Sequence, residues 1–210
     1  MNPRWMVVGL MLFLGGCQGS PEPPAPKAPA APSISQPTGP EPRNALKWKA
    51  TVLREVRFWW GMEEPRDTFA AQIHQESRWN EAAKSPVGAG GLAQFMPGTA
   101  EWIAKLYPKD LQPADAYDPK WAIRALVKYD KWLWEKFPKV PERADRFAFS
   151  LASYNAGLGW LQKESKVARD PVRWYDSTEL VCLRKAMACA ESRTYVRNIW
   201  LKWRPLYGTW

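Results

Sequence analysis

Proline is distributed very unevenly along this chain of 210 residues, and the distribution limits where a core can form. Nine of the 20 prolines lie in residues 18–44, between Ala, Ser and Gly: Pro21, Pro23, Pro24, Pro26, Pro29, Pro32, Pro37, Pro40 and Pro42. Such a segment buries too little apolar surface to order its backbone, so we expect a disordered, semi-rigid tether. At about 3 Å per residue in polyproline geometry it would reach on the order of 80 Å. We expect one packed domain, over residues 45–210.

The apolar residues of this domain recur at helical spacing, and no segment alternates as a strand does. Some helix ends carry recognisable signals: Pro97 and Pro119 suit first turns, Asp118 suits an N-cap, and Gly157 can end a helix. The expected helices cover residues 45–60, 68–76, 97–106, 119–137, 143–154 and 191–203. The sequence therefore predicts a mainly α fold.

One glutamate stands where a predicted helix meets a glycine-rich loop. An apolar stripe over residues 68–76 places Glu76 at the end of a rigid element. Glycines at positions 88, 90 and 91 let the following loop approach a ligand closely, while Ser85 and Gln94 supply polar groups. We interpret this junction as one wall of a cleft.

Three blocks of residues carry a resemblance to a known enzyme family. They are Glu76-Ser77 with Ser85-Pro86-Val87-Gly88-Ala89-Gly90-Gly91-Leu92-Ala93-Gln94-Phe95-Met96-Pro97-Gly98-Thr99, then Tyr154-Asn155-Ala156-Gly157, then Glu191-Ser192-Arg193-Thr194-Tyr195-Val196. In this order they resemble the motifs of the soluble lytic transglycosylases (SLT, goose-type-lysozyme-like family), over about residues 65 to 200. Ala93 departs from the pattern, since the family often has Met there. The resemblance implies a lysozyme-like helical domain whose glycine-rich loop belongs to the active site.

The resemblance also implies a reaction that needs one carboxyl group. Glu76 would protonate the bridge between N-acetylmuramic acid and N-acetylglucosamine in peptidoglycan. It would then take the proton of the muramoyl C6 hydroxyl as that oxygen closes a 1,6-anhydro ring, without consuming water. A carboxyl group in apolar surroundings keeps its proton near neutral pH, as this role requires.

Further site residues are carried over from the same motifs. We expect Ser85 and Tyr154 to orient Glu76, and Tyr195 to complete or brace the cleft. The residues expected to bind or orient substrate are, in full, Ser77, Ser85, Gln94, Met96, Tyr154, Asn155 and Tyr195. Among the fourteen tryptophans, Trp79 is the best placed for stacking on a sugar. Helical spacing assigns Trp121, Trp132, Trp134, Trp200 and Trp203 to core or rim packing.

Two other functions remain open at this point. A hydrolytic lysozyme would need a second carboxylate, and the motif blocks offer none at an obvious position; Glu81 and Asp67 are discounted. A peptidoglycan-binding lipoprotein without catalytic activity would have no use for the intact Glu76. The sequence does not distinguish roles in growth, in secretion or in a mobile element, and it names no protein partner.

The amino terminus resembles a lipoprotein signal. Residues 5–13 form a short apolar stretch, and Leu14-Gly15-Gly16-Cys17 resembles a lipobox. We expect residues 1–16 to be cleaved and Cys17 to be acylated, followed by a linker to residue 44 and the catalytic domain over 45–210. Gln18 favours the periplasmic face of the outer membrane, by resemblance to Gram-negative lipoproteins.

The formal charge of +9 suits acidic partners. Because the export signal argues against nucleic acid, stem-peptide carboxylates and anionic lipids are the alternatives, beside a basic surface with no partner. We expect Cys182 and Cys189 to form a disulfide rather than remain reduced. We expect no metal and no cofactor, because the chain has a single histidine and no ligand spacing typical of a metal site.

Overall fold

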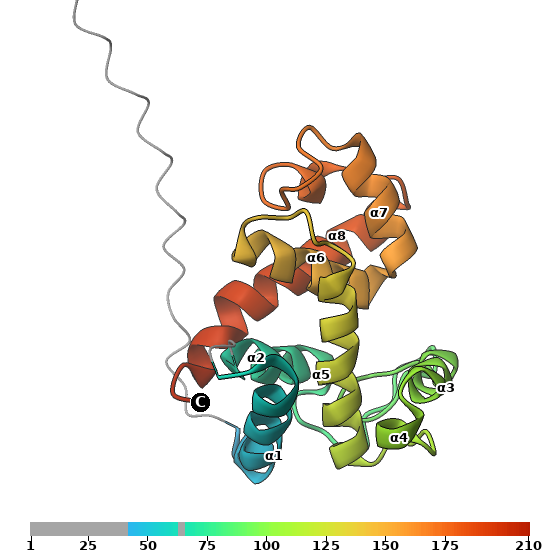
Figure 1. The fold of residues 1–210 in the computed structure, drawn as a ribbon, viewed down its shortest axis with the longest axis vertical. Coiled ribbons are helices and arrows are strands. Elements are labelled where there is room, and N and C mark those ends of the chain that lie inside the picture. Colours follow the sequence, from blue (N-terminus) through green and yellow to red (C-terminus); the bar gives the residue numbers. More distant parts are fainter. Residues whose placement is uncertain (1–41, 63–65) are drawn as a thin grey trace, which may run out of the picture. The chain divides into compact units, whose positions relative to one another are not determined.

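The computed structural model describes residues 42–62 and 66–210, and this part of the chain is helical (Figure 1). The α-helices are α1 (Arg43–Trp60), α2 (Arg66–Ser77), α3 (Pro97–Leu106), α4 (Pro108–Leu111), α5 (Pro119–Glu135), α6 (Arg143–Ala156), α7 (Leu158–Val167) and α8 (Ala186–Arg197). The turns η1 (Thr178–Leu180) and η3 (Arg204–Tyr207) are 3₁₀-helical, and η2 (Asn198–Trp203) is a π-helix. The described residues form only isolated β-bridges, so the predicted mainly α fold is confirmed. The predictions for the signal, Cys17 and nearly all of the tether lie outside the described residues.

Local signals in the sequence locate several helix ends. The Asp118 carboxylate accepts a hydrogen bond from the Lys120 amide at 2.9 Å, and Pro119 occupies the first turn of α5. Gly157 follows α6 with φ at 90°, and its N–H donates to the Ser153 carbonyl at 2.8 Å. These predicted ends are confirmed. The expected helix over 191–203 instead begins five residues earlier, as α8, and its last turns widen into η2.

Helix α2 is largely enclosed by its neighbours. It packs against α1 on one side and against η2 and η3 on another, and every residue from Thr68 to His74 is buried. Helix α5 contacts both α1 and α6, and α6 in turn contacts α7 and α8. Figure 1 shows α6, α7 and α8 together at one end of the described part, and α1 to α5 at the other. Because α2 is enclosed, its carboxyl-terminal end is held rigidly.

Trp79 does not reach a surface where it could stack on a sugar. Its side chain is fully buried, and its Nε1 donates to the Tyr207 hydroxyl at 2.7 Å. The backbone at Arg78 and Trp79 is left-handed, with φ of 52° and 64°, which turns the chain back after α2. The stacking prediction for Trp79 is therefore wrong. The packing prediction holds for Trp121, which is buried, and for Trp134, Trp200 and Trp203, which pack against the core.

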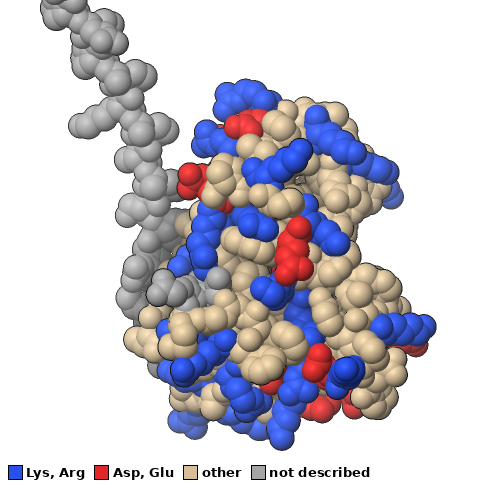
Figure 2. Space-filling model, in the orientation of Figure 1, with Lys and Arg blue, Asp and Glu red and all other residues tan. Residues whose placement is uncertain are grey.

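The surface of the described part carries many basic side chains. Figure 2 shows Lys and Arg spread over the whole visible face, with Asp and Glu in small groups among them. On this face the positive charge is therefore dispersed. No helix in residues 42–62 and 66–210 is both long enough and apolar enough to cross a bilayer.

The backbone conformation of the glycine-rich loop requires a glycine at position 91. Its φ is 71°, and a Cβ there would lie 1.8 Å from the Ala116 carbonyl oxygen, so no other residue fits without moving that segment. We expect Gly91→Ala to lower the free energy of unfolding by about 3 kcal/mol or more. Gly159→Ala in α7, where the added methyl group meets no atom within 4 Å, should change it by less than about 1 kcal/mol. Urea unfolding measures both, and equal effects would contradict this account of the loop.

Candidate active site

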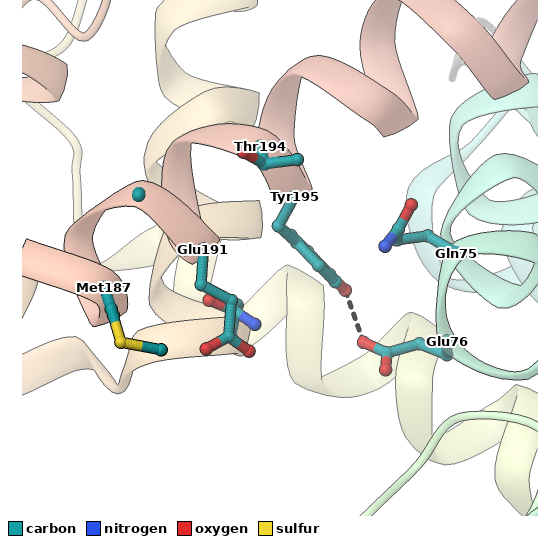
Figure 3. A pocket seen from close by; sticks show the side chains of 8 residues that line it. Gln75, Glu76, Met187, Glu191, Thr194 and Tyr195 are labelled. Carbon is teal, nitrogen blue, oxygen red and sulfur yellow. Dashed lines mark hydrogen bonds between the residues drawn. The ribbon is translucent and has the colours of Figure 1, made fainter.

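Glu76 is the penultimate residue of α2 and faces a pocket of about 540 Å³ between α2 and α8. Its Oε1 accepts a hydrogen bond from the Tyr195 hydroxyl at 2.5 Å. Glu191 and Tyr195 reach the same pocket from α8 (Figure 3). The remaining lining residues are Gln75, Asn155, Met187, Ala190 and Thr194. Two segments separated by more than a hundred residues thus build one site.

A second pocket, of about 460 Å³, is also lined by Glu76 and is bounded by the glycine-rich loop. Glu76, Asn155 and Glu191 line both pockets, so the two form one continuous cleft. It is also lined by five residues that belong to the motif blocks of the sequence, namely Ser85, Gln94, Met96, Thr99 and Tyr154.

The surroundings of Glu76 favour its protonated form. Burial raises the pKa of this carboxyl group from 4.5 to about 8, and the nearby charge of Glu191 adds to the rise, while the hydrogen bond from Tyr195 opposes it. At neutral pH most molecules therefore carry a proton on Glu76. The site can supply a proton to a bound ligand without an acidic medium.

The hydrogen bonds of three predicted residues stabilise the loop. Tyr154 donates through its hydroxyl to the Ala93 carbonyl at 2.7 Å, and Ser85 Oγ accepts from the Ala89 amide at 2.9 Å. The Gln94 side-chain amide donates to the carbonyls of Ala83 and Gly91 at 3.2 and 2.9 Å. Ser85 and Tyr154 were expected to orient Glu76, but their hydrogen bonds go to the loop backbone instead. The hydrogen bond to Glu76 comes from Tyr195.

Ser77 lies apart from the other predicted residues. Its hydroxyl donates to the Ile73 carbonyl one turn earlier in α2, at 3.3 Å, and it lines neither of the pockets that contain Glu76. The position directly after Glu76 points elsewhere because consecutive helical residues are rotated by about 100° around the axis.

A second carboxylate, which the motif blocks did not predict, enters the cleft. Glu191 lines both pockets around Glu76, whereas Glu81 pairs with Lys47 at 2.7 Å and Asp67 pairs with Arg204 at 2.7 Å. Glu191 precedes Tyr195 by four residues, so both lie on one face of α8. This four-residue spacing is visible in the sequence and could have predicted that Glu191 enters the cleft together with Tyr195.

Another carboxyl group lies deeper in the fold. Asp130, on α5, is buried, and burial raises its pKa well above the ordinary value, with a smaller contribution from Glu76. The Gln72 side-chain amide donates to its Oδ1 at 3.4 Å.

Among the described residues, no group of three or more His, Cys, Asp or Glu side chains is arranged to hold a metal ion.

Asn155, which lines both pockets, is held in place by a chain of hydrogen bonds. The Ser192 hydroxyl donates to its Oδ1 at 2.9 Å, and Arg184 donates to Ser192 Oγ at 3.3 Å. Arg184 also donates to both carboxylate oxygens of buried Glu164, at 3.0 and 3.1 Å. Arg184 lies inside the loop that the disulfide Cys182–Cys189 closes. The cystine loop thus supports one wall of the cleft.

Comparison with known proteins agrees with this arrangement. The family model described as "Transglycosylase SLT domain" matches residues 60–176, more than half of the chain. The soluble lytic murein transglycosylase of Escherichia coli K12 is 32% identical over 149 residues, which are 68% of this chain and 21% of that protein. Membrane-bound lytic murein transglycosylase F of Pasteurella multocida is 34% identical over 111 residues, 51% of this chain and 21% of that protein. The chain spans about a fifth of the length of these relatives.

Solved structures share the fold. An inactive Glu-to-Gln variant of the lytic transglycosylase Slt from Pseudomonas aeruginosa matches with a TM-score of 0.55 and 25% identity, over 77% of this chain and 24% of that one. The 70-kDa soluble lytic transglycosylase in complex with bulgecin A matches with a TM-score of 0.54 and 29% identity, over 80% and 25%. The predicted lysozyme-like helical domain is confirmed, and the chain belongs to the SLT transglycosylase family.

Proposed function

We propose that this protein is a peptidoglycan lytic transglycosylase that cleaves the β-1,4 bond between N-acetylmuramic acid and N-acetylglucosamine. The observation that carries the proposal is a glutamate with a raised pKa, hydrogen-bonded to Tyr195, in the cleft of an SLT-family domain. The similar proteins named above are lytic murein transglycosylases. The first step would be transfer of the Glu76 proton to the oxygen of the scissile bond.

The second step would use the same side chain as a base. Glu76 becomes a carboxylate when it loses its proton, and the Tyr195 hydroxyl stabilises this form through its hydrogen bond. Because the pKa of Glu76 is about 8, the carboxylate is a stronger base than an ordinary glutamate. It would accept the proton of the muramoyl C6 hydroxyl as that oxygen attacks C1 and closes the 1,6-anhydro ring. No cofactor takes part in this scheme.

The remaining cleft residues would bind and position the glycan. Gln94, Met96 and Asn155 line the cleft beside Glu76 and would contact the sugars. Ser85 and Tyr154 would act through the loop, since their hydrogen bonds stabilise its backbone. Ser77 would support the end of α2 rather than touch the substrate.

One observation favours a second candidate, a hydrolytic muramidase. Glu191 shares the cleft with Glu76, and a hydrolase uses a second carboxylate to activate water or to act as a nucleophile. We place transglycosylation first because the chain belongs to the SLT family.

Cleavage of purified sacculi, followed as loss of turbidity, tests the proposal against a binding protein without catalytic activity. The domain should clear the suspension and release soluble muropeptides. Binding to sacculi without any release would contradict an enzymatic function of either kind.

We further propose that the domain is tethered to the periplasmic face of the outer membrane through Cys17, after removal of residues 1–16. The lipobox-like sequence before Cys17 and the proline-rich segment after it support this proposal. We expect Cys17→Ala to abolish incorporation of labelled palmitate, while Cys182→Ala leaves it intact because that cysteine lies in the folded domain. Normal labelling of the Cys17 variant would refute the anchor.

A further inference from the structure

A third pocket, of about 290 Å³, adjoins the cleft and is lined largely by aromatic side chains. Its walls come from the first six residues of α3, the carboxyl-terminal half of α5 and the first residue of α7: Gly98, Thr99, Trp102, Tyr129, Trp132 and Leu158. Thr99 and Tyr129 also line the cleft around Glu76. Leu158 follows directly on Gly157, which lines that cleft too. The aromatic pocket is therefore an extension of the proposed active site.

The rings in this pocket hold one another in place. The Trp102 ring packs edge-on against Trp132 at 5.0 Å between centroids and against Tyr129 at 6.0 Å. The Lys136 ammonium group covers one face of Trp132 at 4.4 Å. Trp102 remains 42% exposed although it packs against two other rings. It therefore offers a fixed, partly open aromatic surface at low cost in side-chain entropy.

Two hydroxyl groups border this surface. In the described part of the chain, neither the Thr99 nor the Tyr129 hydroxyl has a hydrogen-bond partner, so both are available to a ligand. Burial raises the pKa of Tyr129 to about 12, with a smaller effect from Asp130, so its hydroxyl stays a donor at every physiological pH. An aromatic face beside polar groups matches a sugar ring, which has an apolar face and a rim of hydroxyl groups.

We propose that the aromatic pocket around Trp102 is a binding subsite for a further N-acetylated sugar of the same glycan strand that occupies the Glu76 cleft. This inference rests on the proposed function. Trp102 lies outside the three sequence blocks that carry the family resemblance. The subsite extends the bound length of the strand beyond the cleavage site and makes affinity depend on chain length.

The experiment measures binding without cleavage. A hexasaccharide of β-1,4-linked N-acetylglucosamine is titrated by calorimetry into Glu76→Gln protein, alone and combined with a second substitution. We expect Trp102→Ala to weaken binding roughly 3- to 10-fold, the range for loss of one aromatic contact. Trp160→Ala is the matched control, because Trp160 is also 42% exposed, lies on α7 and lines none of these pockets; its binding should be unchanged.

The outcomes separate the subsite from the proposed function. Unchanged binding in the Trp102 variant, or an equal loss in the Trp160 variant, overturns the subsite while the enzymatic proposal stands. If the Glu76→Gln protein binds no hexasaccharide and the wild-type domain releases nothing from sacculi, the proposed function fails and the subsite fails with it. Circular dichroism of each variant confirms that its fold is intact, and Trp102→Phe, which keeps an aromatic face, should restore most of the affinity.

Discussion

Replacing Glu76 by Gln is expected to slow cleavage of sacculi by about 10²- to 10⁴-fold while leaving the fold intact. The substitution keeps the size of the side chain and preserves an oxygen that can accept from the Tyr195 hydroxyl, but it removes the transferable proton. Initial rates of muropeptide release measure the effect. Glu81→Gln is the matched control, because Glu81 pairs with Lys47 outside the cleft. This variant should cleave sacculi at the wild-type rate.

The same substitution should stabilise the protein at alkaline pH. The pKa of Glu76 is about 8 in the folded state, against an ordinary value of 4.5. Between these values the folded state holds a proton that the unfolded state has lost, so this group lowers the free energy of unfolding as the pH rises. The advantage of Glu76→Gln should therefore grow from pH 4.5 to pH 8 and then level off, reaching about 1–2 kcal/mol after allowance for partial solvent screening. For the activity prediction, a Glu76→Gln protein that is folded and cleaves sacculi at the wild-type rate would show that Glu76 is not the acid.

Tyr195→Phe should lower the rate roughly 10- to 100-fold, because it removes a hydrogen bond that stabilises a charged group in the cleft. It should also alter the pH profile. In the wild type, we expect activity to fall as Glu76 loses its proton, at about pH 8. Since the Tyr195 hydrogen bond lowers the pKa of Glu76, its loss raises that pKa, and the alkaline limb should move to higher pH.

Tyr154→Phe is the comparison for this prediction. Its hydroxyl donates to the Ala93 carbonyl rather than to Glu76, so its removal should leave the alkaline limb in place, whatever it does to the rate. A pH profile measured on sacculi at constant ionic strength distinguishes the two variants. If the alkaline limb of the Tyr195→Phe profile stays at the wild-type position, as that of Tyr154→Phe should, Tyr195 does not set the pKa of Glu76.

Local signals were enough to predict most of the helices. The Asp118 cap, the first-turn proline after it and the glycine after α6 are each decided by a few neighbouring residues. The position of Trp79 could not be read in this way, because the left-handed turn at the end of α2 directs its ring into the core to meet Tyr207 near the carboxyl terminus. That contact joins residues that are distant in sequence, and no local pattern encodes it.

The site followed the same division. The motifs located Glu76 and its loop, and they named Tyr195 without giving its partner. The contact between Tyr195 and Glu76 depends on how α8 packs beside α6 at the edge of the cleft, which periodicity does not determine. The same packing brings Glu191 into the cleft. The setting of the exposed Trp102 ring likewise depends on how α3 packs against α5, which no local pattern in the sequence determines.

The most direct test of the central claim is the chemistry of the released ends. Sacculi digested in water enriched in ¹⁸O should yield muropeptides that end in 1,6-anhydro-N-acetylmuramic acid and contain no solvent oxygen, as a single-glutamate transglycosylase requires. Products that instead carry ¹⁸O at a reducing end would contradict the claim and identify a hydrolase, with Glu191 as the carboxylate placed to activate the water.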